Sequence, residues 1–435
     1  MSVSPVSGSL ILMKIPELLA PAGTLRNLRY AIAYGADAVY AGMPRYSLRV
    51  RNNDFSTIEN LATGIEQVHA KDKAFFMATN LLPHNSKVKT FMADMEPIIE
   101  LGPDALIMAD PGLIMMVRER WPEIAVHLSV QANTMNYASV RFWQQLGIKR
   151  IILSRELSLD QVEEIRQECP DMELEVFVHG ALCIAYSGRC LLSGYFNHRD
   201  ANQGSCTNAC RWDYKVKDGE EDISGDVRPA EVKLLEEANR PGELMPIEED
   251  EHGTYIMNSK DLRAVEHVER LVKIGIDSLK IEGRTKSHYY TARTAQVYRK
   301  AIDDAVAGRP FDPDLLGKLE NLASRGYTDG FYQRHHDHET QNYIDNHSKS
   351  VQQRFVGELV AYDHATGMAE VEVKNKFSVG DELELIMPGG NRSFRLQEMH
   401  DMDGQPTDVA PGSGYRVQIP VENGECELGL LACNL

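Results

Sequence analysis

The chain has 435 residues, 43% of them hydrophobic, and its 46 basic and 64 acidic side chains give a formal charge of −18. This length suits one large domain and a smaller one, and the near-average composition excludes a disordered, fibrous or collagen-like protein. No apolar run approaches the roughly 20 residues that span a bilayer, so we expect no membrane association. Seven cysteines, behind a flexible tail (1–13) that lacks the features of an export signal, favour a cytoplasmic location.

A repeated pattern of helix, glycine and short apolar run extends through the first 280 residues. Such a pattern, shown by the runs after Gly35, Gly102, Gly147 and Gly275, is typical of αβ steps in a parallel sheet. It predicts eight strands: Glu17–Leu19, Ala38–Tyr40, Ala74–Asn80, Ala105–Met108, Val126–Ser129, Arg150–Leu153, Glu173–Val178 and Ser278–Lys280.

Eight β/α steps indicate an α/β protein with a TIM-like, distorted or regular, β/α barrel, and a doubly wound open sheet is the alternative. The gap of about 100 residues between the seventh and eighth strands is too long for one crossover and must hold an insertion. From about Gln352, alternating runs separated by glycine turns predict a small all-β barrel-like domain. We therefore expect a catalytic barrel domain at 14–340, with an acidic insertion at 218–251, and a linker with the β-domain at 341–435.

Polar residues stand where several predicted strands end. In a β/α barrel these positions ring the C-terminal face, where active sites lie, although loops are polar in any protein. Glu282 and Arg284 could bind an anionic substrate or transfer protons, or they could form an internal ion pair that closes the barrel. The ring comprises Asn80, Asp110, Ser129, Gln131, Ser154, Arg155, Glu156, Glu282 and Arg284.

Four cysteines fall within 28 residues directly after the seventh strand: Cys183, Cys190, Cys206 and Cys210. Thiolates bind zinc or iron–sulfur clusters, and this irregular spacing suits a four-iron cluster better than paired zinc knuckles. Four inert loop cysteines, or disulfides, are the alternatives. The other three, Cys169, Cys426 and Cys433, are expected to be small hydrophobic residues. The tract with His335, His336 and His338 is interpreted as a solvated linker rather than a metal site.

One stretch combines arginines with an aromatic residue: Arg45, Tyr46, Arg49 and Arg51. Such a stretch could follow phosphates and stack a base, although a solvated loop is the default interpretation. The net charge does not oppose RNA binding, because segment 218–251 carries −10 and segment 351–435 carries −8, which leaves the remaining chain neutral. We expect RNA to approach the barrel mouth near Arg45–Arg51.

Several segments together resemble the collagenase-like peptidase family of unassigned catalytic type. They are ELLAPAG, HLSVQAN, EVFVHGALCIAYSGRCLLSGY, CTNACRW and LKIEGR. The resemblance extends from about Glu17 to Leu435, and the long cysteine-containing stretch is the family's signature.

The resemblance implies an oxygen-independent hydroxylase that forms 5-hydroxyuridine at the wobble position of tRNA. It also implies an iron–sulfur cluster (4Fe-4S) and prephenate as the hydroxyl source, with a possible electron donor and with no DNA or membrane partner. By position, Cys183, Cys190 and Cys206 match the family's first three ligands. Cys210 is the fourth candidate here, whereas some relatives use a cysteine further downstream.

Prephenate is a dicarboxylate, so cationic partners are expected for it. The substrate-binding candidates are Asn80, Gln131, Arg155, Lys260, Lys280 and Arg284, and the catalytic candidates are Glu282 and Arg284. Two other functions remain open: a peptidase that acts on collagen-like chains, and a non-catalytic RNA-binding scaffold.

Overall fold

The computed structural model describes residues 14–182 except 44 and 49–52, residues 260–333 except 323–325, and residues 353–435 except 422–426. It also describes Tyr186, Arg189 and six short strands between 220 and 254. Several predicted features lie outside the described residues: the tail 1–13, Arg49, Arg51, Cys183, Cys190, Cys206, Cys210, Cys426, His335, His336 and His338.

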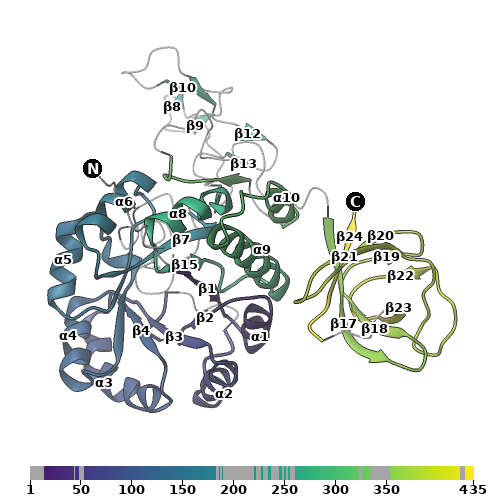
Figure 1. Ribbon diagram of the computed structural model, residues 1–435, viewed down its shortest axis with the longest axis horizontal. Helices are drawn as coiled ribbons and strands as arrows, with labels where there is room; N and C mark the ends of the chain where they lie inside the picture. Colours follow the sequence, from purple (N-terminus) through teal and green to yellow (C-terminus); the bar gives the residue numbers. More distant parts are fainter. Residues whose placement is uncertain are drawn as a thin grey trace, which may run out of the picture.

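Eight parallel strands close into a barrel (Figure 1). They are β1 (Glu17–Pro21), β2 (Ala38–Ala41), β3 (Ala74–Thr79), β4 (Ala105–Met108), β5 (Ala125–Leu128), β6 (Arg150–Ile152), β7 (Glu173–Ala181) and β15 (Ser278–Ile281). Closure is shown by β15, which pairs in parallel with both β1 and β7. The eight predicted strands are therefore confirmed, and the open-sheet alternative is wrong.

Helices surround the strands (Figure 1). They are α1 (Leu25–Ala33), α2 (Ile58–His69), α3 (Asn85–Glu100), α4 (Pro111–Arg120), α5 (Tyr137–Gln145), α6 (Leu159–Glu168), α8 (Val268–Ile274), α9 (His288–Val306) and α10 (Asp314–Glu320), with 3-10 turns η1 (Val130–Ala132) and η4 (Val265–His267). Side-chain caps fix several starts, as at Thr24, Asp110 and Ser158, whose oxygens accept from backbone N–H groups. At the end of α1, Gly35 has φ +106°, and a Cβ there would meet Arg299 Cγ at 2.6 Å.

Two further strands extend the barrel sheet at its β7 edge. Strand β14 (Asp261–Arg263) runs antiparallel to the end of β7, and β16 (Tyr327–Thr328) runs parallel to β14. Between β7 and β14 the chain forms the short strands β8 (Glu220–Glu221), β9 (Val227–Arg228), β10 (Leu234–Glu236), β11 (Leu244–Pro246), β12 (Glu249–Asp250) and β13 (Gly253–Thr254). The sequence predicted the insertion but neither β14 nor β16.

The C-terminal domain is an antiparallel β-structure, as predicted. Its six-stranded sheet has the order β21-β20-β24-β17-β18-β23, and β19 pairs with β22. The strands are β17 (Gln353–Asp363), β18 (Met368–Val373), β19 (Phe377–Ser378), β20 (Glu382–Ile386), β21 (Arg392–Arg395), β22 (Val409–Ala410), β23 (Arg416–Pro420) and β24 (Leu430–Asn434). Buried Cys433 belongs to the core of this domain, and Cys169 to that of the barrel, as expected for both.

The two domains share a buried junction beside α9 (Figure 1). Ile386, Leu430 and Ala432 of the β-domain join the hydrophobic core of the barrel. The Arg293 guanidinium of α9 donates to both carboxylate oxygens of Glu384, at 3.0 and 2.5 Å, and to Gln353.

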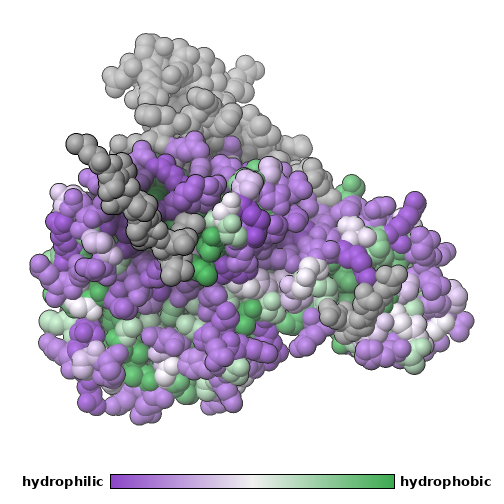
Figure 2. All heavy atoms as spheres, viewed as in Figure 1, coloured by the Kyte–Doolittle hydropathy of each residue, from purple (hydrophilic) through white to green (hydrophobic). Residues whose placement is uncertain are grey.

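The molecular surface on the face shown in Figure 2 is mostly hydrophilic. Among the described residues, no helix is long and apolar enough to cross a membrane.

Candidate functional site

A cavity lies at the C-terminal ends of the barrel strands, where the sequence predicted the site. Its described part measures about 50 Å³, enough for a charged group and a few waters but less than the roughly 300 Å³ of typical small-molecule pockets. A ligand held here must therefore extend outward from the mouth. The cavity is lined by Tyr40, Leu48, Ala78, Asn80, Ile107, Ser129, Val130, Gln131, Ile152, Arg155, Phe177, Lys280, Glu282 and Arg284.

Arg155 and Glu282 form one wall of this cavity. The Arg155 guanidinium lies 3.7 Å from the centroid of the Phe177 ring, and its Nη2 lies 3.5 Å from Glu282 Oε2. Glu282 thus contacts Arg155, which follows a different strand. The long separation makes this a weak contact, which a bound anion can replace at the guanidinium.

Arg284 is buried on the opposite side, beside the turn after β2. Its Nη1 donates to Ser47 Oγ at 2.6 Å, and the guanidinium lies 5.6 Å from the centroid of the Tyr40 ring. Gly42 makes this position possible, because a Cβ there would approach Arg284 Nη1 to 2.4 Å. The hydroxyl and the ring together fix the guanidinium in one orientation.

A series of buried ion pairs begins at Lys280, which lines the bottom of the cavity, here called its floor. Lys280 Nζ donates to Glu175 Oε1 at 2.7 Å, and Arg150 Nη1 lies 3.3 Å from Glu175 Oε2 and 2.7 Å from Glu17 Oε1. Burial lowers the pKa of Lys280, although Glu175 opposes this effect. Burial alone would also lower the pKa of Arg150, but Glu17 and Glu175 outweigh it, so that this pKa is raised. Glu175 thus links Lys280, which lines the cavity, to Arg150 and Glu17.

Three residues of the site were not predicted from the sequence: Glu175, Tyr40 and Ser47. A signal for Glu175 existed: it alternates with apolar residues in ELEVFV, and period-two spacing places it on the same face as Phe177, which lines the mouth. With Glu175 included, the described floor and walls hold three cations (Arg155, Lys280 and Arg284) and two carboxylates. This excess of positive charge favours an anionic ligand.

Asn80 and Gln131 complete the opposite wall. Asn80 Nδ2 donates to Ser129 Oγ at 3.2 Å, and its Oδ1 accepts from the Leu48 backbone N–H. Two other members of the predicted ring have structural roles, since Asp110 caps α4 and Ser154 donates to Asn133. Lys260 precedes β14 and does not line the cavity.

The ring of Tyr46 is not exposed for stacking on a base in the described structure. Only 1% of its surface is exposed, because the ring packs edge-on against Phe91 and the hydroxyl donates to Asp94. Arg45 is half exposed, with Nε 3.3 Å from Asp94 Oδ2 and Nη2 donating to Thr90. Among the described residues of this stretch, Arg45 is the cation that is exposed enough to contact a phosphate.

The cysteine segment begins where β7 reaches the mouth. Leu182 is buried, and Cys183 is the next residue. Gly180 has φ +105°, and a Cβ there would lie 2.4 Å from the Glu282 carbonyl oxygen, so β7 and the Glu282 turn are in close contact. Four thiolates that follow this point are a donor set that fits a 4Fe-4S cluster.

His179 is fully buried one residue before Gly180. Its Nδ1 lies 3.3 Å from the Tyr298 hydroxyl, and its Nε2 has no hydrogen-bond partner. Burial, together with Lys286 and Arg263, lowers the pKa of His179 to about 3. The imidazole is therefore neutral at physiological pH.

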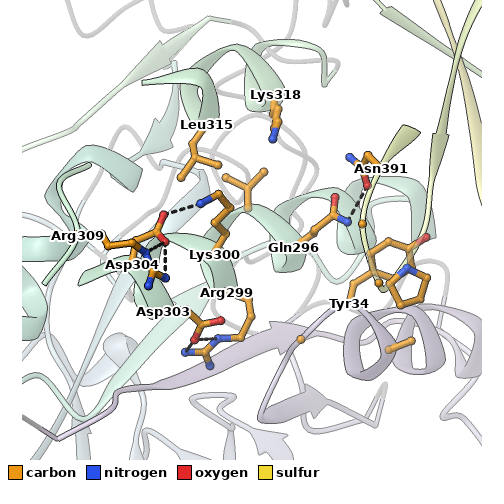
Figure 3. A pocket seen from close by; sticks show the side chains of 16 residues that line it. Tyr34, Gln296, Arg299, Lys300, Asp303, Asp304, Arg309, Leu315, Lys318 and Asn391 are labelled. Atoms are coloured by element: carbon orange, nitrogen blue, oxygen red, sulfur yellow. Dashed lines mark hydrogen bonds and ion pairs between the residues drawn. The ribbon is translucent and has the colours of Figure 1, made fainter. Parts of the chain in front are cut away.

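A larger cleft of about 490 Å³ lies at the domain junction, between α9, α10 and the turn after β20 (Figure 3). Its cations are mostly matched by acids: Lys300 and Arg309 both contact Asp304 at 2.7 Å, and Arg299 contacts Asp303 at 2.8 Å. Lys318 of α10 also lines the cleft. These short-range pairs make the cleft a structural feature of the junction.

Comparison with known proteins gives matches over both domains. The model of peptidase family U32 matches residues 23–342, and that of the peptidase family U32 C-terminal domain matches residues 351–432. A protein named tRNA hydroxylation protein P from Escherichia coli (strain K12) is 61% identical over 93% of this chain and 94% of that protein. Its namesake from Haemophilus influenzae is 57% identical over 93% of each chain.

Among solved structures, the C-terminal domain of a putative U32 peptidase from Geobacillus thermoleovorans is 29% identical to this chain. The match covers 18% of this chain and 96% of that chain, with a TM-score of 0.17.

Proposed function

The chain belongs to peptidase family U32, and we propose that it hydroxylates tRNA, forming 5-hydroxyuridine at the wobble position. The observation that carries the proposal is the cation-rich barrel mouth, in a chain that is 61% identical, over 93% of its length, to a protein named for tRNA hydroxylation. The three cations of the mouth suit a small anionic co-substrate, and the β7 exit leads from there directly into the cysteine segment.

In this proposal the mouth binds the carboxylates of prephenate. Arg284, fixed by Ser47 and Tyr40, would hold one carboxylate, and Arg155 would hold the other after moving away from Glu282. The co-substrate would extend outward, because the described cavity is too small to enclose it. The uridine would enter unstacked from the RNA, as base chemistry requires.

Glu282 is suited to proton transfer once Arg155 binds the co-substrate. Replacement of C5–H by C5–OH releases a proton from the base, and Glu282 is the carboxylate that lines the described cavity. Cys183, Cys190, Cys206 and Cys210 would hold the iron–sulfur cluster, which would supply the electron-transfer chemistry of the reaction.

The proposal is tested in cells that lack their own gene for this modification. Wild-type protein should restore 5-hydroxyuridine, measured by mass spectrometry of tRNA nucleosides, and Cys183→Ser should not. Cys169→Ser is the matched control, since Cys169 is buried in the barrel core and should be dispensable. Normal 5-hydroxyuridine with Cys183→Ser would contradict the proposal, and retained tRNA binding by that variant would then favour a scaffold.

The cluster has a separate test. Protein purified without oxygen should be brown, absorb near about 400 nm and contain about four irons per chain. Colourless protein with stoichiometric zinc would contradict the iron–sulfur assignment.

The family name also suggests peptide hydrolysis. In the part of the chain that the structure describes, no serine or cysteine side chain is hydrogen-bonded to a histidine, as a nucleophile and its base would be. Incubation of the anaerobic protein with gelatin should therefore give no cleavage, and cleavage lost in the Arg284→Met variant would reverse this assignment.

A further inference from the structure

We propose that Glu266, His267 and Asp329 bind a divalent first-row metal ion on the outside of the barrel. These three side chains offer ligand atoms that all lie within 4.8 Å of one another. The proposal requires neither the cysteines nor the hydroxylation, so it stands or falls separately from the proposed function.

Sheet pairing brings the three residues together. Glu266 and His267 belong to η4, which follows β14, and Asp329 follows β16 directly. Strands β14 and β16 are parallel neighbours, with Leu262 opposite Thr328, so the turns that follow them lie side by side. The backbone at both places is fixed by hydrogen bonds, from His267 N–H to the Ala264 carbonyl and from Gly330 N–H to Thr328 Oγ1.

The separations fit a coordination shell. His267 Nε2 lies 3.0 Å from Asp329 Oδ2 and 3.5 Å from Glu266 Oε1. Ligands about 2.0–2.2 Å from a metal are about 3.0–3.6 Å apart at octahedral or tetrahedral angles. Both separations from His267 fall in this range. The carboxylate oxygens of Glu266 and Asp329 lie within 4.8 Å of each other, so they must approach by about 1 Å at most for one metal ion to bind all three atoms.

The surroundings favour a cation and give it access. A cavity of about 470 Å³ opens beside His267, with Asp160, Arg270 and Tyr332 among its lining residues, and can supply water ligands. Arg270 is the cation in that lining, and it contacts both Asp160 and Glu163. Arg270 is thus already paired with two carboxylates, and the carboxylates of Glu266 and Asp329 beside His267 add negative charge that attracts a cation.

One imidazole, two carboxylates and water suit Mn²⁺ or Zn²⁺. Mn²⁺ is the better probe, because zinc also binds thiolates and the cysteine segment would compete for it. If His267 instead only shares a proton with Asp329, no metal will bind at this site.

The test uses the full-length protein titrated with MnCl₂ and followed by electron paramagnetic resonance. Electron spin-echo modulation should show coupling of bound Mn²⁺ to an imidazole ¹⁴N, which weak binding to surface carboxylates elsewhere would not give. His267→Ala should abolish that coupling, and Asp329→Asn should weaken binding at this site at least tenfold. The matched control is Glu269→Gln, which removes a carboxylate two residues away that pairs with Lys273.

Two results would overturn the proposal. One is the absence of ¹⁴N coupling in the wild type at millimolar Mn²⁺, and the other is its persistence in His267→Ala. Should His267→Ala fail to fold, the nearly isosteric Asp329→Asn variant replaces it. A dissociation constant for Mn²⁺ equal to that of the wild type would then overturn the proposal. Levels of 5-hydroxyuridine play no part in either result.

Discussion

The barrel mouth and the domain junction both contain buried charges beside a cavity, but their charges are organised differently. At the junction, Arg293 is enclosed by Glu384 and Gln353, and the cations of the adjacent cleft contact Asp303 and Asp304. At the mouth, Lys280 contacts Glu175 at 2.7 Å, but Arg155 lies 3.5 Å from Glu282 and stacks on the Phe177 ring. The junction cleft is the larger cavity, at about 490 Å³ against about 50 Å³. The two regions therefore differ in how closely their arginines are paired with carboxylates, as well as in size.

The largest expected effect is on stability, at the junction. Arg293→Met should reduce the free energy of unfolding by about 3–5 kcal/mol, because it leaves Glu384 buried without its cation. Chemical denaturation measures this change. The double variant Arg293→Met/Glu384→Leu should recover much of the loss, and a single variant as stable as the wild type would show that this junction is not held by charge.

The next effect is on activity, at the mouth. Arg284→Met should lower the rate of 5-hydroxyuridine formation about ten- to a hundredfold, since a charge-assisted hydrogen bond to a carboxylate is worth about 1.5–3 kcal/mol. Single-turnover assays with purified tRNA and varied prephenate would measure it. Unchanged kinetics would remove the mouth cations from the proposed co-substrate site.

Acid should weaken the barrel next to the mouth. His179 has a pKa of about 3 in the folded protein against about 6.5 when unfolded, so below pH 6.5 the unfolded chain binds more protons. The folded state should therefore lose up to about 1.4 kcal/mol per pH unit from this group as the pH falls from 6.5 towards 3. His179→Gln should reduce that slope in denaturation curves between pH 4 and 7. A slope equal to that of the wild type would exclude His179 as the source.

The smallest effect is expected in the cleft. Lys300→Met removes a half-exposed cation paired with Asp304, which should change stability by about 1 kcal/mol or less and leave 5-hydroxyuridine formation within twofold of the wild type. It is the matched control for Arg284→Met. A large loss of activity here would mean that the cleft, and not only the mouth, binds a substrate.

Local patterns predicted most of the fold. Helix, glycine and apolar strand recur with the period of a β/α unit, and the eight predicted strands are the eight of the barrel. Strands β14 and β16 were missed because they are two or three residues long and have no repeat of their own. Their pairing depends on contacts between residues far apart in the chain, which periodicity does not reveal.

The residues of the candidate site could be predicted only in part, because local patterns locate strand ends but not the packing of loops. Asn80, Gln131, Arg155, Lys280, Glu282 and Arg284 meet in one cavity because each stands at or just beyond a strand end, and closure of the barrel brings strand ends together. Tyr46 is buried and Lys260 lies outside the lining of the described cavity, and neither could be foreseen, since packing of the loops decides the environment of both. The contact of Glu282 with Arg155 was likewise not predictable from spacing, because Arg155 comes from a different strand.

Helix α9 starts four residues after Arg284 and carries Arg293 into the junction, so one rigid rod joins the mouth to the β-domain. Its contacts with the β-domain, through Tyr289, Arg293 and Gln296, all lie in the first half of the helix, close to the mouth. A fluorophore pair placed on that domain and on α5 would therefore report whether the two domains change their separation when a ligand binds, without any label near the chemistry.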